Sequence, residues 1–223
     1  MEYLRRTHSE VLGNTKIFHN TSEEYHFVES CLNKIKSRPN GSYLLEMCDK
    51  YTALDKEIHI KVMHSGQCST EPNFNDRFRE THNLPDDKTD PLYQSMIKVR
   101  YKPMPPSRRG IGVGSEIRFN MEESRVVDEE GIGERIQNQG LAFISLAHEL
   151  VHAYHFAHGT HIPEEPHRPL IDHEEDRAIG IMDYKGLGPN ENSVRSDYNL
   201  PQRSTRFDRN EFAPLAAQYL PNE

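Results

Sequence analysis

The segment His148-Glu149-Leu150-Val151-His152 constrains this chain more than any other, because it has the pattern H-E-x-x-H. Apolar residues recur around it at three- and four-residue spacing, which predicts one continuous helix. Positions i and i+4 of a helix lie on the same face, one turn apart, so both imidazoles can reach a single ion. Glu149 projects from the adjacent stripe, where its carboxylate can hold a water molecule. The pattern predicts a zinc site with His148 and His152 as ligands.

Hydrophobic periodicity predicts the elements around this helix. Thr21-Ser22-Glu23-Glu24 has the form of a capping box and predicts a helix that Pro39 and Gly41 close. Polar and apolar residues alternate in three segments, which predicts strands over residues 57–62, 95–101 and 114–120. We expect a long loop over residues 69–91, and helices over residues 42–54, 172–182 and near 212–219. The H-E-x-x-H helix is expected to begin near residue 134 or 135 and to end at Gly159.

This order of elements indicates an α+β fold with a zincin-like metalloprotease core. Such a core combines a small mixed sheet, the H-E-x-x-H active helix and a second ligand-bearing helix. We expect one domain over residues 1–223, with N-terminal helices and sheet in 1–130 and a zinc-binding helical part in 131–223. The strand over residues 114–120 is the expected sheet edge for pairing with an extended substrate.

A catalytic zinc usually takes three protein ligands and leaves a fourth position for water. We favour Glu175 as the third ligand, because Ala178 and Ile179 follow it as an apolar face that can pack toward the active helix. Neighbours on a helix point about 100° apart, so Glu174 and Glu175 cannot both face the metal. Glu174 is therefore the second choice.

The third ligand has further candidates. His158 occupies the third-His position of the longer H-E-x-x-H-x-x-G-x-x-H motif, but His155 stands where that motif has its turn glycine. Asp172 and His173 begin the second helix and Asp183 follows it, and these three are also possible ligands.

The catalytic roles follow from this metal site. Glu149 is the expected general base, which takes a proton from the attacking water and passes it to the leaving amine. A group that stabilises the developing oxyanion is also needed. Tyr184 and Tyr198 are candidates because they follow the second helix, and Arg203 is a third.

Composition restricts the partners. The net charge is −8, which argues against nucleic-acid binding because that needs a basic face. No apolar run is long enough to insert into a membrane, and the polar first ten residues predict no secretory signal peptide. The three cysteines form no C-x-x-C pair, which favours a reducing compartment. We expect one Zn²⁺ per chain and a monomer.

Two stretches resemble a known family. Residues 145–153, S-L-A-H-E-L-V-H-A, and 175–180, E-D-R-A-I-G, are similar to the NleD-type zinc metalloproteases, which are type III secretion effectors of enteropathogenic and some plant-pathogenic bacteria. Glu191-Asn192 to Arg195 and Leu200-Pro201-Gln202-Arg203 resemble the tail motif of that family. The resemblance implies an effector that is injected into the host cytoplasm and cleaves JNK- and p38-type MAP kinases in the activation loop, which suppresses inflammatory signalling.

Two different functions remain compatible with these residues. The chain can be a zinc peptidase with a different protein substrate. It can also be a metal-binding or kinase-docking module without catalytic activity, in which the H-E-x-x-H pattern is accidental or degenerate.

Overall fold

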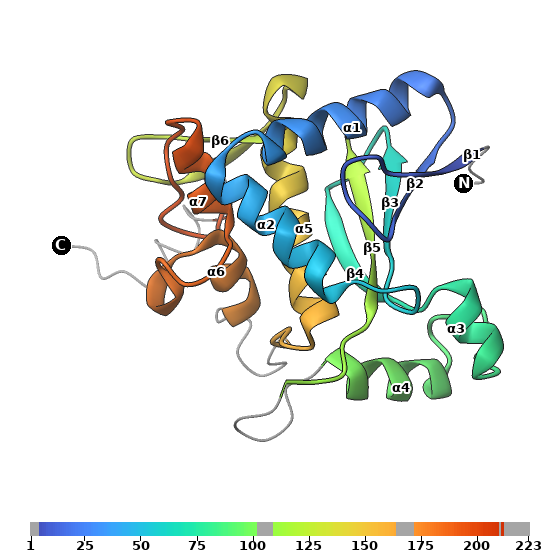
Figure 1. Cartoon of the computed structure of the whole chain (residues 1–223). Helices are drawn as coiled ribbons and strands as arrows, with labels where there is room; N and C mark the ends of the chain where they lie inside the picture. Colours follow the sequence, from blue (N-terminus) through green and yellow to red (C-terminus); the bar gives the residue numbers. More distant parts are fainter. Residues whose placement is uncertain (1–4, 102–108, 164–171, 210, 212–223) are drawn as a thin grey trace.

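A five-stranded mixed sheet organises the protein (Figure 1), seen in a computed structural model that describes residues 5–101, 109–163, 172–209 and 211. The strand order is β1-β2-β3-β5-β4. Strands β2, β3 and β5 are parallel, whereas β1 and β4 run antiparallel to their neighbours at the two edges. The strands are β1 (Arg5–His8), β2 (Thr15–His19), β3 (Ile58–Met63), β4 (Ser69–Asn73) and β5 (Gly114–Asn120). A separate hairpin consists of β6 (Glu123–Val127) and β7 (Gly133–Gln137).

Helix α5 lies in the middle of the fold, with the sheet on one side and most of the other helices around it, whereas α3 lies apart from it (Figure 1). It packs against β4 and β5, against α1 and α2, and against α6 and α7. The helices are α1 (Ser22–Lys36), α2 (Pro39–Tyr51), α3 (Asp76–Thr81), α4 (Pro91–Tyr101), α5 (Ala142–His158), α6 (His173–Ile179) and α7 (Glu191–Asp197). Two short 3₁₀ turns are η1 (Gln139–Leu141) and η2 (Met182–Tyr184). Within the described residues, no helix combines the length and apolar character needed to span a membrane.

The main hydrophobic core fills the space between the sheet and these helices. Alternate residues of the central strands are fully buried on this face, as the pleat of a strand requires. They include Ile58, Ile60 and Val62 of β3 and Ile117 and Phe119 of β5. Burial of each such side chain contributes about 1.5–3 kcal/mol. The position of α5 is therefore fixed by the same core that holds the sheet together.

Several predictions are confirmed. Thr21 caps α1, with its hydroxyl accepting from the Glu24 amide and the Glu24 carboxylate accepting from the Thr21 amide. Strands β3 and β5 lie where alternation predicted strands. Helix α5 ends at Gly159, whose φ of 74° is left-handed. A Cβ there would come within 2.3 Å of the Gly110 carbonyl oxygen, so only glycine fits this turn.

Other predictions are wrong. Residues 95–101 belong to helix α4, because Tyr93 and Ile97, four positions apart, are both buried in a second apolar cluster with Phe156 of α5. The predicted loop 69–91 contains strand β4 and helix α3. Helix α5 begins at Ala142, since residues 133–137 pair with β6 as strand β7.

The predicted substrate edge also needs correction. Strand β5 lies between β3 and β4, so its backbone groups are paired on both sides. The edge next to α5 is β4. Pro72 within β4 is typical of an edge strand, because proline has no amide hydrogen for the ladder. The helix expected near residues 212–219 lies outside the described residues.

Candidate metal centre

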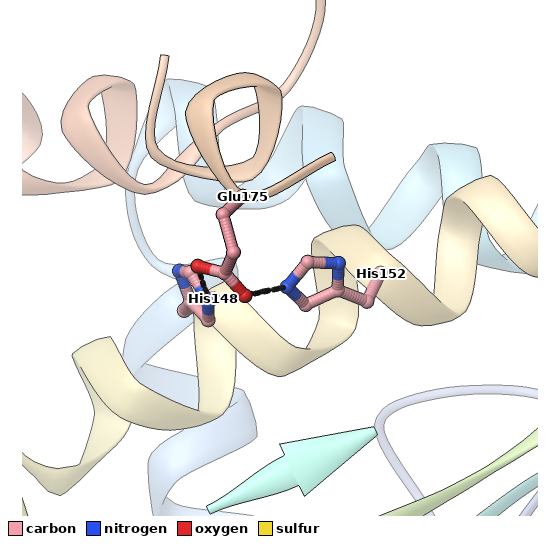
Figure 2. Close-up of side chains that lie close together, drawn as sticks. All are labelled: His148, His152 and Glu175. Atoms are coloured by element: carbon pink, nitrogen blue, oxygen red, sulfur yellow. Dashed lines mark hydrogen bonds and ion pairs between the residues drawn. The ribbon is translucent and has the colours of Figure 1, made fainter. Parts of the chain in front are cut away.

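Two helices bring His148, His152 and Glu175 together. The two histidines lie one turn apart on α5, and both are buried. The Glu175 carboxylate reaches them from α6 and lies between the two imidazoles (Figure 2). Its oxygens lie 3.1 Å from His152 Nε2 and 3.4 Å from His148 Nε2, and the two Nε2 atoms are 3.2 Å apart.

These distances fit a tetrahedral metal site. Zinc binds histidine nitrogen and carboxylate oxygen at about 2.0–2.2 Å, so two ligand atoms of a tetrahedral site lie about 3.3 Å apart. The three separations in this cluster fall close to that value. One carboxylate and two imidazoles are also a donor set that catalytic zinc uses. His148, His152 and Glu175 can therefore hold a zinc ion and leave a fourth position open.

Each histidine is held at its other nitrogen by a buried carboxylate. Nδ1 of His148 lies 2.9 Å from Glu191 Oε2, and Nδ1 of His152 lies 3.2 Å from Glu174 Oε1. Such carboxylates fix the ring orientation and the tautomer, which leaves Nε2 available for a metal. Glu174 also accepts a hydrogen bond from the Ile162 amide and contacts Nδ1 of His155. Of the two neighbouring carboxylates, Glu175 thus faces the Nε2 atoms and Glu174 lies behind His152.

Glu191 is the centre of a buried charge network. Its carboxylate accepts from Arg195 Nε at 2.7 Å and from Arg203 Nη1 at 3.2 Å, in addition to His148. Arg195 lies one turn further along α7, and Arg203 follows in the next segment, where its backbone bonds with the Asn192 side chain. The tail motif of the sequence therefore builds the support behind His148.

The Glu149 carboxylate lies beside the cluster and contacts the edge strand. Thr70 of β4 has its hydroxyl 2.6 Å from Glu149 Oε2 and 3.1 Å from the Glu149 carbonyl oxygen. Burial raises the pKa of Glu149 above its usual value, and the charges of His148 and His152 and the Thr70 hydroxyl limit this rise. A carboxylate with a raised pKa suits proton transfer near neutral pH.

The carboxylates make the cluster favourable for positive charge. Burial by itself lowers the pKa of His148, but Glu175 and Glu191 outweigh it and raise the pKa to about 9. Burial likewise opposes ionisation of Glu175, yet the two histidines hold its pKa well below the usual value. The same carboxylate charges would stabilise a metal cation bound to the Nε2 atoms.

Two cavities open on either side of this cluster. The first, of about 280 Å³, is lined by His148, Glu149 and Glu175 together with Ile144, Arg206 and Phe207, among others. The second, of about 220 Å³, is lined by His152, Glu149 and Glu175 together with Ser69 and Thr70 of β4, among others. Cys68, directly before β4, lines both cavities. The beginning of β4 therefore lies beside the three donors.

Within the described residues, none of the remaining ligand candidates joins His148, His152 and Glu175, although Asp172 lines the second cavity. His158 has Nδ1 3.2 Å from the Thr160 hydroxyl, and its ring lies 4.3 Å from that of Tyr51, away from the cluster. It stays on the helix because no glycine turns the chain at position 155. Asp183 is exposed on η2. Asp172 caps α6 by accepting from the amides of residues 174 and 175, and the adjacent His173 packs against Tyr184.

The three oxyanion candidates are also not on the open side of the cluster. The Tyr184 ring packs against His173, and the Tyr198 hydroxyl donates to the Lys34 carbonyl oxygen of α1. The Arg203 side chain is 0% exposed and lies behind His148, where it pairs with Glu191. Each of these side chains is therefore engaged in packing or in support of another residue.

Sequence reasoning missed Arg206, which does line the first cavity. Its Nη1 lies 3.7 Å from Asp176 Oδ1, and its Nη2 is buried without a hydrogen-bond partner among the described residues. Arg203 Nη2 donates to the Arg206 carbonyl oxygen at 2.6 Å, which ties this segment to the network behind His148. The only sequence signal for Arg206 was its position three residues after Arg203. The contact of Thr70 with Glu149 was also missed, because Thr70 lies in the segment 69–91 that was predicted to be a loop.

Comparison with known proteins adds a family match. A protein-family model with the description "Effector protein" matches residues 14–206. The search of curated proteins gave no match. Among solved structures, the chain resembles the catalytic domain of Clostridium botulinum neurotoxin serotype F, with a TM-score of 0.44 and 16% identity over 90% of this chain and 56% of that chain.

Two further solved structures give similar values. The botulinum neurotoxin type G light chain has a TM-score of 0.42 and 18% identity, with 81% of this chain and 48% of that chain covered. The botulinum neurotoxin serotype HA light chain has a TM-score of 0.44 and 14% identity, with 89% and 55% covered. The chain spans about half the length of the solved structures that it matches.

Proposed function

Because this chain belongs to the effector-protein peptidase family M91, whose pattern covers residues 14–206, we propose that it is a zinc-dependent endopeptidase. The observation that carries the proposal is the group His148, His152 and Glu175, whose potential ligand atoms all lie within 4.8 Å of one another. The Glu149 carboxylate lies beside this group and lines both adjoining cavities, where it can act on a water molecule.

The chain's own residues perform the proton transfers. Zinc, when bound, polarises the scissile carbonyl and lowers the pKa of water toward about 7. Glu149 accepts the proton of the attacking water and passes it to the nitrogen of the leaving amine. Glu191 and Glu174 keep the imidazoles oriented through their Nδ1 atoms. The free edge of β4 pairs with the substrate backbone and holds it in an extended form.

Arg206 is the proposed oxyanion stabiliser in place of the three residues that the sequence suggested. Arg206 lines the cavity on the His148 side, and its positive charge suits a developing oxyanion. A preorganised cation stabilises the negative charge that develops in the transition state more than it stabilises the bound substrate. Loss of Arg206 is therefore expected to lower kcat and not to raise KM. The Arg203 contact to its carbonyl oxygen keeps Arg206 in place.

The proposed substrates are stress-activated MAP kinases of the JNK and p38 type, cut in the activation loop. The resemblance to NleD-type effectors in residues 145–153, 175–180 and the tail motif supports this choice. The same resemblance supports delivery through a type III secretion system into the host cytoplasm. The protein acts as a monomer in this proposal and uses one Zn²⁺.

Cleavage of recombinant kinases tests the proposal. The zinc-loaded protein is expected to cut a p38- or JNK-type kinase into two fragments, and 1,10-phenanthroline is expected to stop the reaction until zinc is added back. Glu149→Gln is the matched control, because it keeps the shape of the side chain and removes the base. It is expected to bind zinc and to lose about 10²–10⁴-fold in rate.

The outcomes separate the two levels of the proposal. Zinc-dependent cleavage of another protein, with both kinases left intact, would refute only the choice of kinases as substrates. If the zinc-loaded protein cuts no protein at all, or if Glu149→Gln is as active as the wild type, the endopeptidase proposal is wrong.

A further inference from the structure

Thr70 makes an unusual link between the edge strand and the proposed general base. It is paired with Ile117 of β5 in the sheet ladder, so its backbone position is fixed by the sheet. Its hydroxyl points to α5, where Oγ1 lies 2.6 Å from Glu149 Oε2 and 3.1 Å from the Glu149 carbonyl oxygen. Among the described residues, Glu149 Oε1 accepts no comparable hydrogen bond.

The chemistry of the two groups fixes the direction of this hydrogen bond. An ionised carboxylate only accepts, so Thr70 must donate its one hydroxyl proton to Oε2. Hydrogen bonds to charged acceptors are shorter and about twice as strong as neutral ones, and 2.6 Å fits such a bond. The bond occupies Oε2 and limits rotation of the carboxylate, which leaves Oε1 as the oxygen available to water.

We propose that Thr70 is a positioning residue for Glu149, which locks the carboxylate so that one defined oxygen receives the proton of the attacking water. This inference rests on the proposed endopeptidase function. Thr70 keeps its own proton throughout, since the proton moves from water to Glu149 and then to the leaving amine. Because Thr70 stands on β4, the strand proposed to bind the substrate backbone, base and substrate are aligned by the same strand.

Burial makes the restraint effective. Glu149 is 6% exposed, so water competes poorly for Oε2, and loss of the hydroxyl leaves a buried oxygen without its donor. The charged groups around Glu149 are His148 and His152 on its own helix and Glu175 on α6, and none of them replaces the donor on the β4 side. A rotating carboxylate would spend part of its time turned away from the water, which lowers kcat and leaves substrate binding unchanged.

Steady-state kinetics on a cleaved protein substrate test the inference. Thr70→Val keeps the branched shape and removes the hydroxyl, and is expected to lower kcat about ten- to hundredfold with KM changed less than about twofold. Thr70→Ser restores a hydroxyl and is expected to return kcat to within about threefold of the wild type. Thr7→Val is the matched control, since Thr7 lies on β1 at the opposite edge, where its hydroxyl lies 2.8 Å from His19 Nε2.

Two kinetic results would overturn the inference. An increase in KM at constant kcat would make Thr70 a substrate contact. Equal loss of kcat in Thr70→Ser and Thr70→Val would mean that the threonine shape, and not the hydroxyl, matters.

A stability cycle tests the same hydrogen bond without any activity. Urea unfolding is measured for the wild type, Thr70→Val, Glu149→Ala and the double variant. Thr70→Val is expected to change the unfolding equilibrium constant about tenfold more in the wild-type background than in the Glu149→Ala background. Equal effects in both backgrounds would refute the bond, even if the protein cuts no substrate. An active wild type with unchanged kcat in Thr70→Val would refute the positioning role and leave the endopeptidase proposal intact.

Discussion

Replacement of Glu191 by alanine is expected to destabilise the protein more than any other change to a single carboxylate near the metal centre. The Glu191 carboxylate is 3% exposed and accepts from Arg195 at 2.7 Å and from Arg203 at 3.2 Å. These two guanidinium groups are 2% and 0% exposed, so water cannot replace the lost partner. Removal of one member of a buried ion pair costs about 3–5 kcal/mol. That loss is a large part of the about 5–15 kcal/mol that stabilises a typical domain.

Urea unfolding in EDTA measures this cost apart from any effect of zinc binding. Glu116→Ala is the matched control, since Glu116 is also buried and pairs with two lysines, Lys61 at 2.9 Å and Lys88 at 3.0 Å. These lysine side chains are 29% and 36% exposed, so they can turn to water after the change. The control is expected to lose only about 1 kcal/mol. Equal losses in the two variants, or a loss below about 1 kcal/mol in Glu191→Ala, would refute the reasoning.

The remaining predictions concern the site and the response to pH. Glu175→Ala is expected to abolish zinc binding in equilibrium dialysis, whereas Glu174→Gln is expected to lower zinc affinity only about 10–100-fold. A larger loss of zinc affinity in Glu174→Gln than in Glu175→Ala would make Glu174 the ligand. Arg206→Gln is expected to lower kcat about 10²–10³-fold at nearly constant KM, and an unchanged kcat would end its proposed role. Burial opposes ionisation of Glu116, but its lysine partners hold the folded-state pKa below the usual 4.5. Its stabilising effect is therefore present above pH 4.5 and lost as pH falls through the lowered value, so Glu116→Gln should reduce stability at pH 7 more than at pH 3. A pH-independent difference in urea unfolding would contradict this.

The sequence predicted the parts of the fold that depend on local patterns. The α1 capping box, the end of α5 at Gly159 and the alternation in β3 and β5 each involve residues within a few positions of one another. The family resemblance and the H-E-x-x-H spacing also identified the segments that the structure brings together around His148 and His152. Local rules worked here because local structure and burial favour the same conformation.

Elements that depend on distant partners could not be predicted in this way. Strand β4, with the sequence S-T-E-P-N, lacks a β-branched apolar run and forms because it pairs with β5. Polar and apolar residues alternate over residues 95–101, which suggested a strand. The segment is helical because Tyr93 and Ile97, one turn apart in α4, are buried against Phe156 of α5. Helix α5 was predicted to start too early because β7 forms by pairing with β6 and by contacts of Gly133 and Arg135 with the distant Asp208.

The support behind the metal centre was equally hidden. Charged residues are usually exposed, so a single sequence gives no reason to bury Arg195 and Arg203 around Glu191. The tail motif marked these residues by resemblance, but Arg203 was taken as a candidate oxyanion stabiliser. Its burial became evident only when the fold placed α7 behind α5.

Zinc stoichiometry of the tag-free protein tests the central claim most directly. Elemental analysis after dialysis is expected to give one zinc ion per chain for the wild type and close to none for His148→Ala, with circular dichroism showing that both are folded. A folded wild-type protein that retains no zinc, or a His148→Ala variant that retains as much as the wild type, would contradict the account.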